Sequence, residues 1–279
     1  MVQAVIFDVD GTLIDSVDVH AQAWQDIFLR YGVKTDFKAV RDQIGKGGDK
    51  LMKVFVPKGQ IEQQGKEMEA ERAKLFERKY LHQVKPFPRL KRLFERLSDD
   101  GIKIALASSA KKDELEVYKK ITGIGPFLAK DTSSDDVSNS KPDPDIFRAA
   151  QQKLGIDPEN IIAIGDTQYD AESAGKAGMA TIGLLCGGGN RANLLAAGCI
   201  KLYRDPADLL KHYEVSPLVS WGRSSASVSD SGRPRAKKEI AKRQQRVLFL
   251  FGLGIGAAVG LLCAPRCGPE TRAFVWNDR

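Results

Sequence analysis

The stretch AVIFDVDGT, residues 4–12, carries the clearest structural signal in the chain. Its first six residues are almost all apolar and Asp10-Gly11 follows as a turn pair, so we predict a short buried strand over 4–9. Asp8 and Asp10 lie at the end of this strand, on either side of Val9. Open α/β sheets bind ligands at the carboxyl ends of their strands, so both acids are candidate functional residues. The alternative is structural, because Asp-Gly pairs often end a strand.

Downstream of this strand, segments typical of strands alternate with segments typical of helices. Such alternation predicts an α/β fold, a parallel sheet with helices on both faces. Residues 16–86 are the exception: they are helical and predict an all-helical cap domain inserted into a core of residues 1–15 and 87–215. Asp143 is expected to cap a helix that has Pro144 in its first turn. Further strands are predicted over 102–107, 161–165 and 180–185, and further helices over 61–82, 111–121, 144–154, 168–177, 190–197 and 205–213.

Polar side chains follow several of these predicted strands. Ser108 and Ser109 come directly after the strand 102–107, Lys141 lies in a later loop, and Asp166 and Asp170 follow the strand 161–165. Each has a structural alternative: serine and aspartate often begin helices, and a loop lysine is usually solvated. Because the ends of parallel strands meet at one edge of a sheet, their coincidence with the Asp8 strand favours a shared site.

At these positions the sequence resembles the haloacid dehalogenase superfamily. The matching pattern is DVDGT at 8–12, Ser108, Lys141 and GDTQYD at 165–170, within residues 1 to 213. The resemblance implies a Rossmann-like parallel-sheet core with an inserted helical cap, in agreement with the layout above. It also implies phosphoric monoester hydrolysis, since the dehalogenase members lack a second acid in the first motif, where this chain has Asp10.

The resemblance assigns a role to each residue. Asp8 would be the nucleophile and form an aspartyl-phosphate, and Asp10 would protonate the leaving oxygen and then take a proton from water. Ser108, Ser109 and Lys141 would bind the phosphoryl group. Mg²⁺ would offset the repulsion between two anions, and it prefers oxygen ligands. Its ligands would come from Asp8, Asp166, Asp170 and the main-chain carbonyl of Asp10.

The segment DSVDVHAQAW, residues 15–24, bears on the substrate. It resembles the β-phosphoglucomutases and the related sugar-phosphate and phosphoglycolate phosphatases. In the mutases the residue matching His20 helps to hold the acid/base aspartate, although a structural, partly buried histidine is the alternative. Two departures favour a phosphatase over a mutase: Gly165 stands where mutases usually have glutamate, and the loop GKGGDK at 45–50 lacks their arginine. Lys46 and Lys50 are either substitutes for that arginine or solvated.

The charge of +7 is concentrated at the end of the chain. Residues 1–215 hold 32 Lys and Arg against 32 Asp and Glu, whereas residues 216–279 hold 11 against 4. A neutral body argues against nucleic acid as a partner, since binding it requires a basic face. The four cysteines form no CxxC motif or disulfide framework, and the N-terminus resembles no signal peptide. We therefore expect a cytoplasmic catalytic domain.

The last 64 residues predict a membrane attachment. Residues 216–246 are expected to form a basic flexible linker, followed by a transmembrane helix over 247–265 and a short tail over 266–279. The apolar stretch 247–264 would span about 27 Å, and the basic residues before it predict a cytoplasmic enzyme. Residues 254–272 resemble the YtxH-like family of small bacterial membrane proteins. The small residues Gly252, Gly256 and Gly260 share one face of this helix, which would permit self-association.

Taken together, these observations predict a Mg²⁺-dependent phosphatase that hydrolyses a small-molecule phosphate monoester such as phosphoglycolate or a sugar phosphate. Two alternatives remain at this stage. One is a β-phosphoglucomutase-type phosphosugar mutase, which would keep the phosphate on its product. The other is a catalytically inactive, membrane-tethered binding protein. The second is disfavoured because Asp8, Asp10, Ser108, Lys141 and Asp166 are all present.

Overall fold

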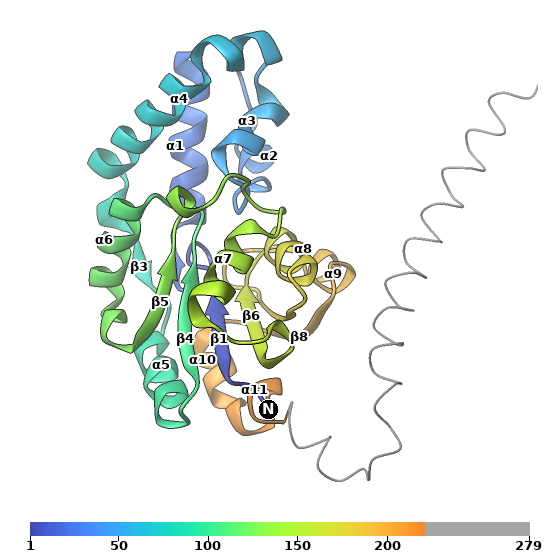
Figure 1. Cartoon of the computed structure of the whole chain (residues 1–279). Helices are drawn as coiled ribbons and strands as arrows, with labels where there is room; N and C mark the ends of the chain where they lie inside the picture. The colour runs from blue at the N-terminus through green and yellow to red at the C-terminus, as the bar shows by residue number, and fades with distance from the viewer. Residues whose placement is uncertain (221–279) are drawn as a thin grey trace, which may run out of the picture. The chain divides into compact units, whose positions relative to one another are not determined.

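The structure, a computed structural model, describes residues 1–220 of the chain. Its centre is a six-stranded sheet in which every strand pair is parallel, as predicted (Figure 1). The first strand lies in the middle, and the chain builds the sheet outward from it in both directions, as in Rossmann-like folds. In spatial order the strands are β5 (Leu128–Thr132), β4 (Lys103–Ala107), β1 (Ala4–Phe7), β6 (Ile161–Gly165), β7 (Ala180–Leu184) and β8 (Cys199–Tyr203).

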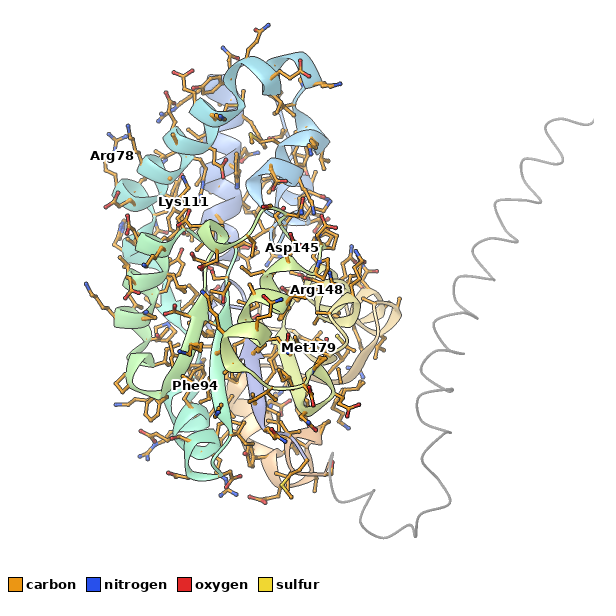
Figure 2. The ribbon with its side chains drawn as sticks, viewed as in Figure 1. Arg78, Phe94, Lys111, Asp145, Arg148 and Met179 are labelled. Atoms are coloured by element: carbon orange, nitrogen blue, oxygen red, sulfur yellow. The ribbon has the colours of Figure 1, made fainter. Side chains whose placement is uncertain are left out.

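Both faces of this sheet are covered, so its central strands are apolar throughout. In β1, Ala4 and Ile6 pack on one face with α7 (Asp145–Leu154), while Val5 and Phe7 pack on the other. Phe94, labelled in Figure 2, stacks on Phe7 with ring centroids 4.9 Å apart. This two-sided burial holds the end of β1, and therefore Asp8, in a fixed position.

Apart from the helices over 90–99 and 217–220, which the sequence analysis did not predict, the core helices match the predicted ones to within a few residues. One prediction about their ends is wrong. Asp143 does not cap α7; the cap position is Pro144, without a side-chain hydrogen bond, and the Asp143 carboxylate binds Lys50 instead. The other core helices are α5 (Leu90–Asp99), α6 (Lys112–Thr122), α8 (Gln168–Lys176), α9 (Arg191–Ala196), α10 (Pro206–Lys211) and α11 (Pro217–Ser220). Short 3₁₀ turns cover Leu81–Gln83, Gly125–Phe127, Ser134–Asp136, Pro158–Asn160 and Tyr213–Val215.

The helical block after the first strand forms a group of four helices at one end of the core (Figure 1). The chain enters it through β2 (Ile14–Asp15) and leaves through β3 (Lys85–Pro86), which pair with each other antiparallel. Entry and exit thus lie side by side. This cap consists of α1 (Val17–Arg30), α2 (Phe37–Arg41), α3 (Gly48–Phe55) and α4 (Lys58–Lys79), with α1 packed against α2 and α4.

The folded core continues to Ser220, because α11 follows the predicted core boundary and its Leu218 is buried. Between residues 1 and 220, the structure contains no helix that combines the length and the apolar character of a membrane span. The predicted linker beyond Ser220, the transmembrane helix over 247–265 with its YtxH-like resemblance, the glycine face and the tail over 266–279 lie outside the described residues. Membrane attachment and cytoplasmic location therefore stay predictions.

Candidate active site

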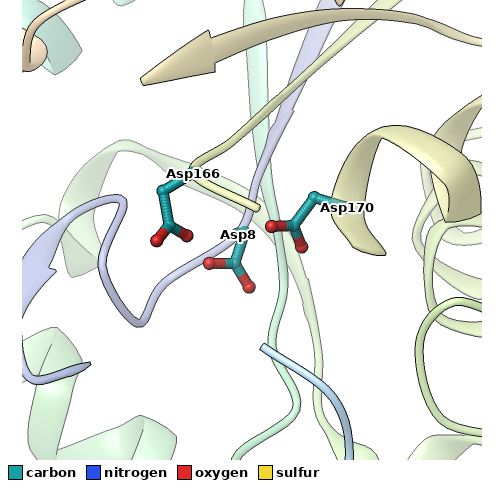
Figure 3. A group of neighbouring side chains, drawn as sticks. All are labelled: Asp8, Asp166 and Asp170. Atoms are coloured by element: carbon teal, nitrogen blue, oxygen red, sulfur yellow. The ribbon is translucent and has the colours of Figure 1, made fainter. Parts of the chain in front are cut away.

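Three buried carboxylates meet at the carboxyl edge of the sheet (Figure 3). Asp8 follows β1, Asp166 follows β6, and Asp170 lies in the first turn of α8. One oxygen from each lies within 4.8 Å of the others. The alternative that Asp166 caps a helix is wrong: Thr167 is the N-cap of α8, and its hydroxyl and amide both donate to Asp170.

The loop after β7 allows the close packing around Asp166. A Cβ atom on Gly187 would lie 1.8 Å from an Asp166 oxygen, and one on Gly11 would lie 2.3 Å from the same oxygen. No side chain fits at such distances, so the backbone approaches this carboxylate from two sides. This close packing of the backbone fixes the position of the Asp166 carboxylate.

Lys141 is the cation of this cluster. Its side chain is buried, and its ammonium group binds the Asp8 carboxylate, lies 2.8 Å from Asp170 and donates to the carbonyl of Ala107 at 3.0 Å. Burial alone would lower the pKa of Lys141, but the charges of Asp170 and Asp8 outweigh burial and raise it. Lys141 therefore stays charged and balances one of the three acids.

The electrostatics of the cluster favour a further cation. Burial raises the pKa of Asp8 to about 7, with Asp170 acting in the same direction and Lys141 opposing it. Burial, followed by the charges of Asp170 and Asp8, raises the pKa of Asp166 well above its usual range. Three carboxylates against one ammonium leave excess negative charge, and oxygen is the ligand that Mg²⁺ prefers. The donor set therefore fits a divalent cation held by Asp8, Asp166 and Asp170.

Thr12 belongs to the same cluster, although the sequence analysis gave it no role. It is buried, and its hydroxyl lies 3.1 Å from Asp8 Oδ2 and 3.2 Å from Asp166 Oδ1. A single hydroxyl proton is thus shared between two carboxylates from different strands. Its position within DVDGT, four residues after Asp8, was the available signal.

Asp10 points to a different set of partners. Its carboxylate accepts a hydrogen bond from Ser16 at 2.6 Å and lies 2.9 Å from Nε2 of His20. Burial opposes ionisation, but the charge of His20 and hydrogen bonds from His20 and Ser16 outweigh burial and lower the pKa of Asp10. The Asp10 carboxylate is not part of the three-acid group, and the predicted ligation by its main-chain carbonyl stays a prediction.

His20 comes from the cap helix α1 and is held from several sides. Its ring stacks on Phe76 of α4 with centroids 4.0 Å apart, and Nε2 also lies 3.2 Å from the Tyr118 hydroxyl. On the other side of the ring, Nδ1 is 3.4 Å from Arg72. His20 therefore links the cap to Asp10 in the core.

The two predicted serines lie beside the cluster. Ser108 is fully buried, and its hydroxyl accepts a hydrogen bond from the amide of Ala110 at 3.1 Å. Ser109 is half-buried. Both line a cavity of about 180 Å³ whose wall also includes Asp8, Asp10, His20 and Lys141.

The other wall of this cavity comes from the cap and from α6. Trp24 of α1, the segment 44–49, and Glu69 and Arg72 of α4 line it, as does Glu114 of α6. Lys46 lines the cavity and is bound to Gln43 at 2.5 Å. Lys50 instead binds the Ser140 carbonyl and Asp143 of the core, so neither of these two lysines is simply solvated.

Residues 5–184 match the sequence profile of the family described as haloacid dehalogenase-like hydrolase. The chain belongs to this hydrolase family. The match covers the core from β1 to β7 together with the cap, and so includes every predicted site residue.

Several relatives of this hydrolase are similar over most of their length. A hydrolase from Pseudomonas syringae, known from its crystal structure, is 31% identical with a TM-score of 0.71, covering 76% of this chain and 98% of that chain. The phosphorylated carbohydrates phosphatase of Thermotoga maritima is 27% identical, covering 75% of this chain and 96% of its own. The phosphoglycolate phosphatase of Neisseria meningitidis is 29% identical, covering 68% and 83%.

The haloacid dehalogenase-like architecture thus gathers residues that are up to 162 positions apart in the sequence, from Asp8 to Asp170. The predicted residues fall into two groups: the Asp8 cluster, which includes Lys141, and the pair of Asp10 and His20. Ser108 and Ser109 line the same cavity as members of both groups. The sequence analysis did not identify Thr12, Glu69 and Arg72.

Proposed function

We propose that this hydrolase is a Mg²⁺-dependent phosphatase that hydrolyses small-molecule phosphate monoesters through an aspartyl-phosphate. The observation that carries the proposal is the three-acid cluster around Lys141, with a second, separately held acid two residues from Asp8. Named phosphatases among the relatives support the reaction class.

The metal would be held by Asp8, Asp166 and Asp170. When bound, Mg²⁺ supplies positive charge that allows a carboxylate and a phosphate to approach each other. Thr12 orients two of the ligands, Asp8 and Asp166. Gly187 and Gly11 leave room for the Asp166 carboxylate. Lys141 lowers the remaining negative charge beside Asp8.

Asp8 is the proposed nucleophile. One of its oxygens forms a bond to phosphorus as the bond from phosphorus to the ester oxygen breaks. Lys141 binds Asp8 in the free enzyme, and its charge would also stabilise the oxygens of the transferring phosphoryl group. The Ser108 hydroxyl and the Ser109 side chain lie in the same cavity wall and would donate hydrogen bonds to those oxygens.

Asp10 is the proposed acid and base. It gives a proton to the leaving ester oxygen, and in the second step it takes a proton from the water that attacks the phosphorus of the aspartyl-phosphate. The second step restores Asp8 and releases inorganic phosphate. His20 and Ser16 hold the Asp10 carboxylate apart from the metal ligands, so the two adjacent acids serve different functions.

The test is phosphate release by the purified full-length chain. Phosphoglycolate, hexose phosphates and nucleoside monophosphates are offered with Mg²⁺ or with a chelator. We expect release from at least one ester, dependent on Mg²⁺, and a loss of at least about 10³-fold in kcat for Asp8→Asn. The control is Asp99→Asn, an exposed acid on α5. No release from any ester, or full activity of Asp8→Asn, would contradict the proposal.

A further inference from the structure

The cavity wall apart from Asp8, Asp10, His20 and Lys141 has balanced charges. This part of the wall contains as many basic as acidic side chains. The basic ones are Lys46, Arg72 and Lys111, and the acidic ones are Asp49, Glu69 and Glu114. The leaving group of a phosphate ester would contact these side chains, so they would select the substrate.

Several of these charged groups already have protein partners. Asp49 accepts a hydrogen bond from Ser140 at 2.6 Å, and Glu114 accepts one from Tyr118 at 2.5 Å. Lys46 is bound to Gln43. These groups are therefore less available to a substrate.

Glu69 differs from them, and the polar contacts of Arg72 are long. Among residues 1–220, Glu69 has no hydrogen-bond or ion-pair partner. Arg72 lies 4.0 Å from the Glu114 carboxylate and 3.4 Å from Nδ1 of His20, and the Nε atom of Arg72 is buried without a hydrogen-bond partner. The two residues are three positions apart on α4, so they share one face of the helix. This face presents an acceptor and a donor to the cavity.

Both groups are held in place by their surroundings. The guanidinium of Arg72 lies 5.6 Å from the ring of Trp24 and 5.8 Å from that of Phe76, within the range of cation–π contacts. Glu69 lies against the start of α3: a Cβ atom on Gly48 would come within 3.2 Å of the Glu69 carboxylate and 2.9 Å of Trp24. The absence of a side chain at Gly48 therefore leaves room for Glu69 beside the indole.

We infer that Glu69 and Arg72 bind hydroxyl groups of the leaving group, and that the substrate is a polyhydroxylated phosphate ester, such as a sugar phosphate, and not a carboxylate-bearing one. This inference rests on the proposed phosphatase function. A hydroxyl both donates and accepts, so it satisfies a carboxylate and a guanidinium together. A carboxylate on the leaving group would be attracted by Arg72 and repelled by Glu69. The repulsion would offset the attraction. A second phosphate would meet the same repulsion.

The test uses two esters of equal carbon number. Phosphoglycolate and 2-hydroxyethyl phosphate differ only in a carboxylate against a CH₂OH group. With the full-length chain and Mg²⁺, we expect kcat/KM for 2-hydroxyethyl phosphate to exceed that for phosphoglycolate by about 10-fold, with hexose phosphates better still. This comparison requires no variant, so it does not depend on the folding of a mutant.

Charge-removing variants then locate the effect. Glu69→Gln should lower kcat/KM for a hexose phosphate by about 10-fold and raise it for phosphoglycolate, whereas Arg72→Gln should lower both. The controls are Glu77→Gln and Arg78→Gln, exposed residues of the same helix; Arg78, labelled in Figure 2, points away from the core. These controls should leave the substrate ratio unchanged.

Two failures are distinguishable. Phosphate release with phosphoglycolate preferred, or an unchanged substrate ratio in Glu69→Gln, would overturn this inference and leave the phosphatase proposal intact. Release from none of the esters would contradict the phosphatase proposal, and the inference with it.

Discussion

Asp8 and Asp10 are two residues apart, yet their pKa values move in opposite directions. Burial and the neighbouring acids raise that of Asp8, while His20 and Ser16 overcome burial and lower that of Asp10. The proposed chemistry needs Asp8 ionised and Asp10 protonated in the first step. A cation at the three-acid cluster would lower the pKa of Asp8, and the charge of a bound phosphate would raise that of Asp10. Ligand binding would thus set both acids for their roles.

Replacing His20 tests whether this residue controls the pKa of Asp10. In His20→Gln the lost attraction and hydrogen bond raise the pKa of Asp10, so the acid form persists to higher pH. We expect the basic limb of the pH profile of kcat/KM to move upward, together with a loss of about 10-fold at neutral pH. Steady-state kinetics from pH 5 to 9 measures both. An unmoved limb would show that His20 has only a structural role.

At the scale of elements, the loop after β7 controls the position of Asp166. Gly187→Ala would put a methyl group where an Asp166 oxygen lies, so the carboxylate or the loop must move. Because small misplacements of catalytic groups are costly, we expect kcat/KM to fall by about 100-fold in a protein that still folds. Gly175→Ala, in an open position of α8, is the control. Kinetics with circular dichroism checks the result, and wild-type activity would contradict it.

The first turn of α3 in the cap is tied to the core through Lys50 and Asp143. Their side chains meet at 2.6 Å and are 23% and 44% exposed, so solvent screens the pair. Solvent-screened pairs couple weakly, so each single Ala variant should lower kcat/KM by no more than about 5-fold. A double-mutant cycle measures their coupling in kcat/KM. Losses that simply add would show that this contact does not hold the cap.

Secondary structure was predictable from sequence where burial is complete on both faces. The central strands carry uninterrupted apolar runs, as AVIF in β1 does. The edge strands β5 and β8, which the sequence analysis did not predict, contain polar residues because one side faces solvent, as LAKDT in β5 illustrates. Asp143 was misassigned because a helix-capping position and an ion-pair partner have the same sequence signature.

The site was predictable to the extent that its residues lie at strand ends. Asp8 and Asp166 could be grouped by topology alone, whereas Lys141 lies in a loop and was assigned to the site by the family resemblance. Glu69 and Arg72 could not, since contact with the site depends on how the cap packs onto the core. One signal existed for Arg72: it shares a helix face with the buried Met68 and Phe76, an unusual place for a charge.

At the scale of the whole molecule, the cluster links stability to pH and metal. Asp8 holds its proton more tightly in the folded state, with a pKa of about 7 against 3.8 for an ordinary aspartate. Between these values the folded state binds more protons, so metal-free stability is highest below pH 4 for this group and falls as pH rises to 7. Asp166, with its raised pKa, acts in the same direction.

Mg²⁺ should restore the stability that the metal-free protein loses as the pH rises. It binds the ionised carboxylates of the folded state, so we expect the Tm difference between Mg²⁺ and chelator to grow from pH 5 to pH 8. Thermal unfolding of the full-length chain at several pH values measures it. Asp166→Asn should reduce the difference, while Asp99→Asn should keep it. If the Tm at pH 8 is the same with Mg²⁺ and with chelator, the proposed metal site at the cluster is contradicted.

The most direct test of the account is chemical trapping of a phosphorylated Asp8. Borohydride reduces an acyl phosphate to an alcohol, which would convert Asp8 to homoserine. The Asp10→Asn variant, given Mg²⁺ and p-nitrophenyl phosphate, whose leaving group requires no proton, should accumulate the intermediate because no base activates water. Peptide mass spectrometry is predicted to find homoserine at position 8, and only when the ester is present. Turnover of the ester by this variant with Asp8 unmodified, or with another aspartate reduced, would contradict the account.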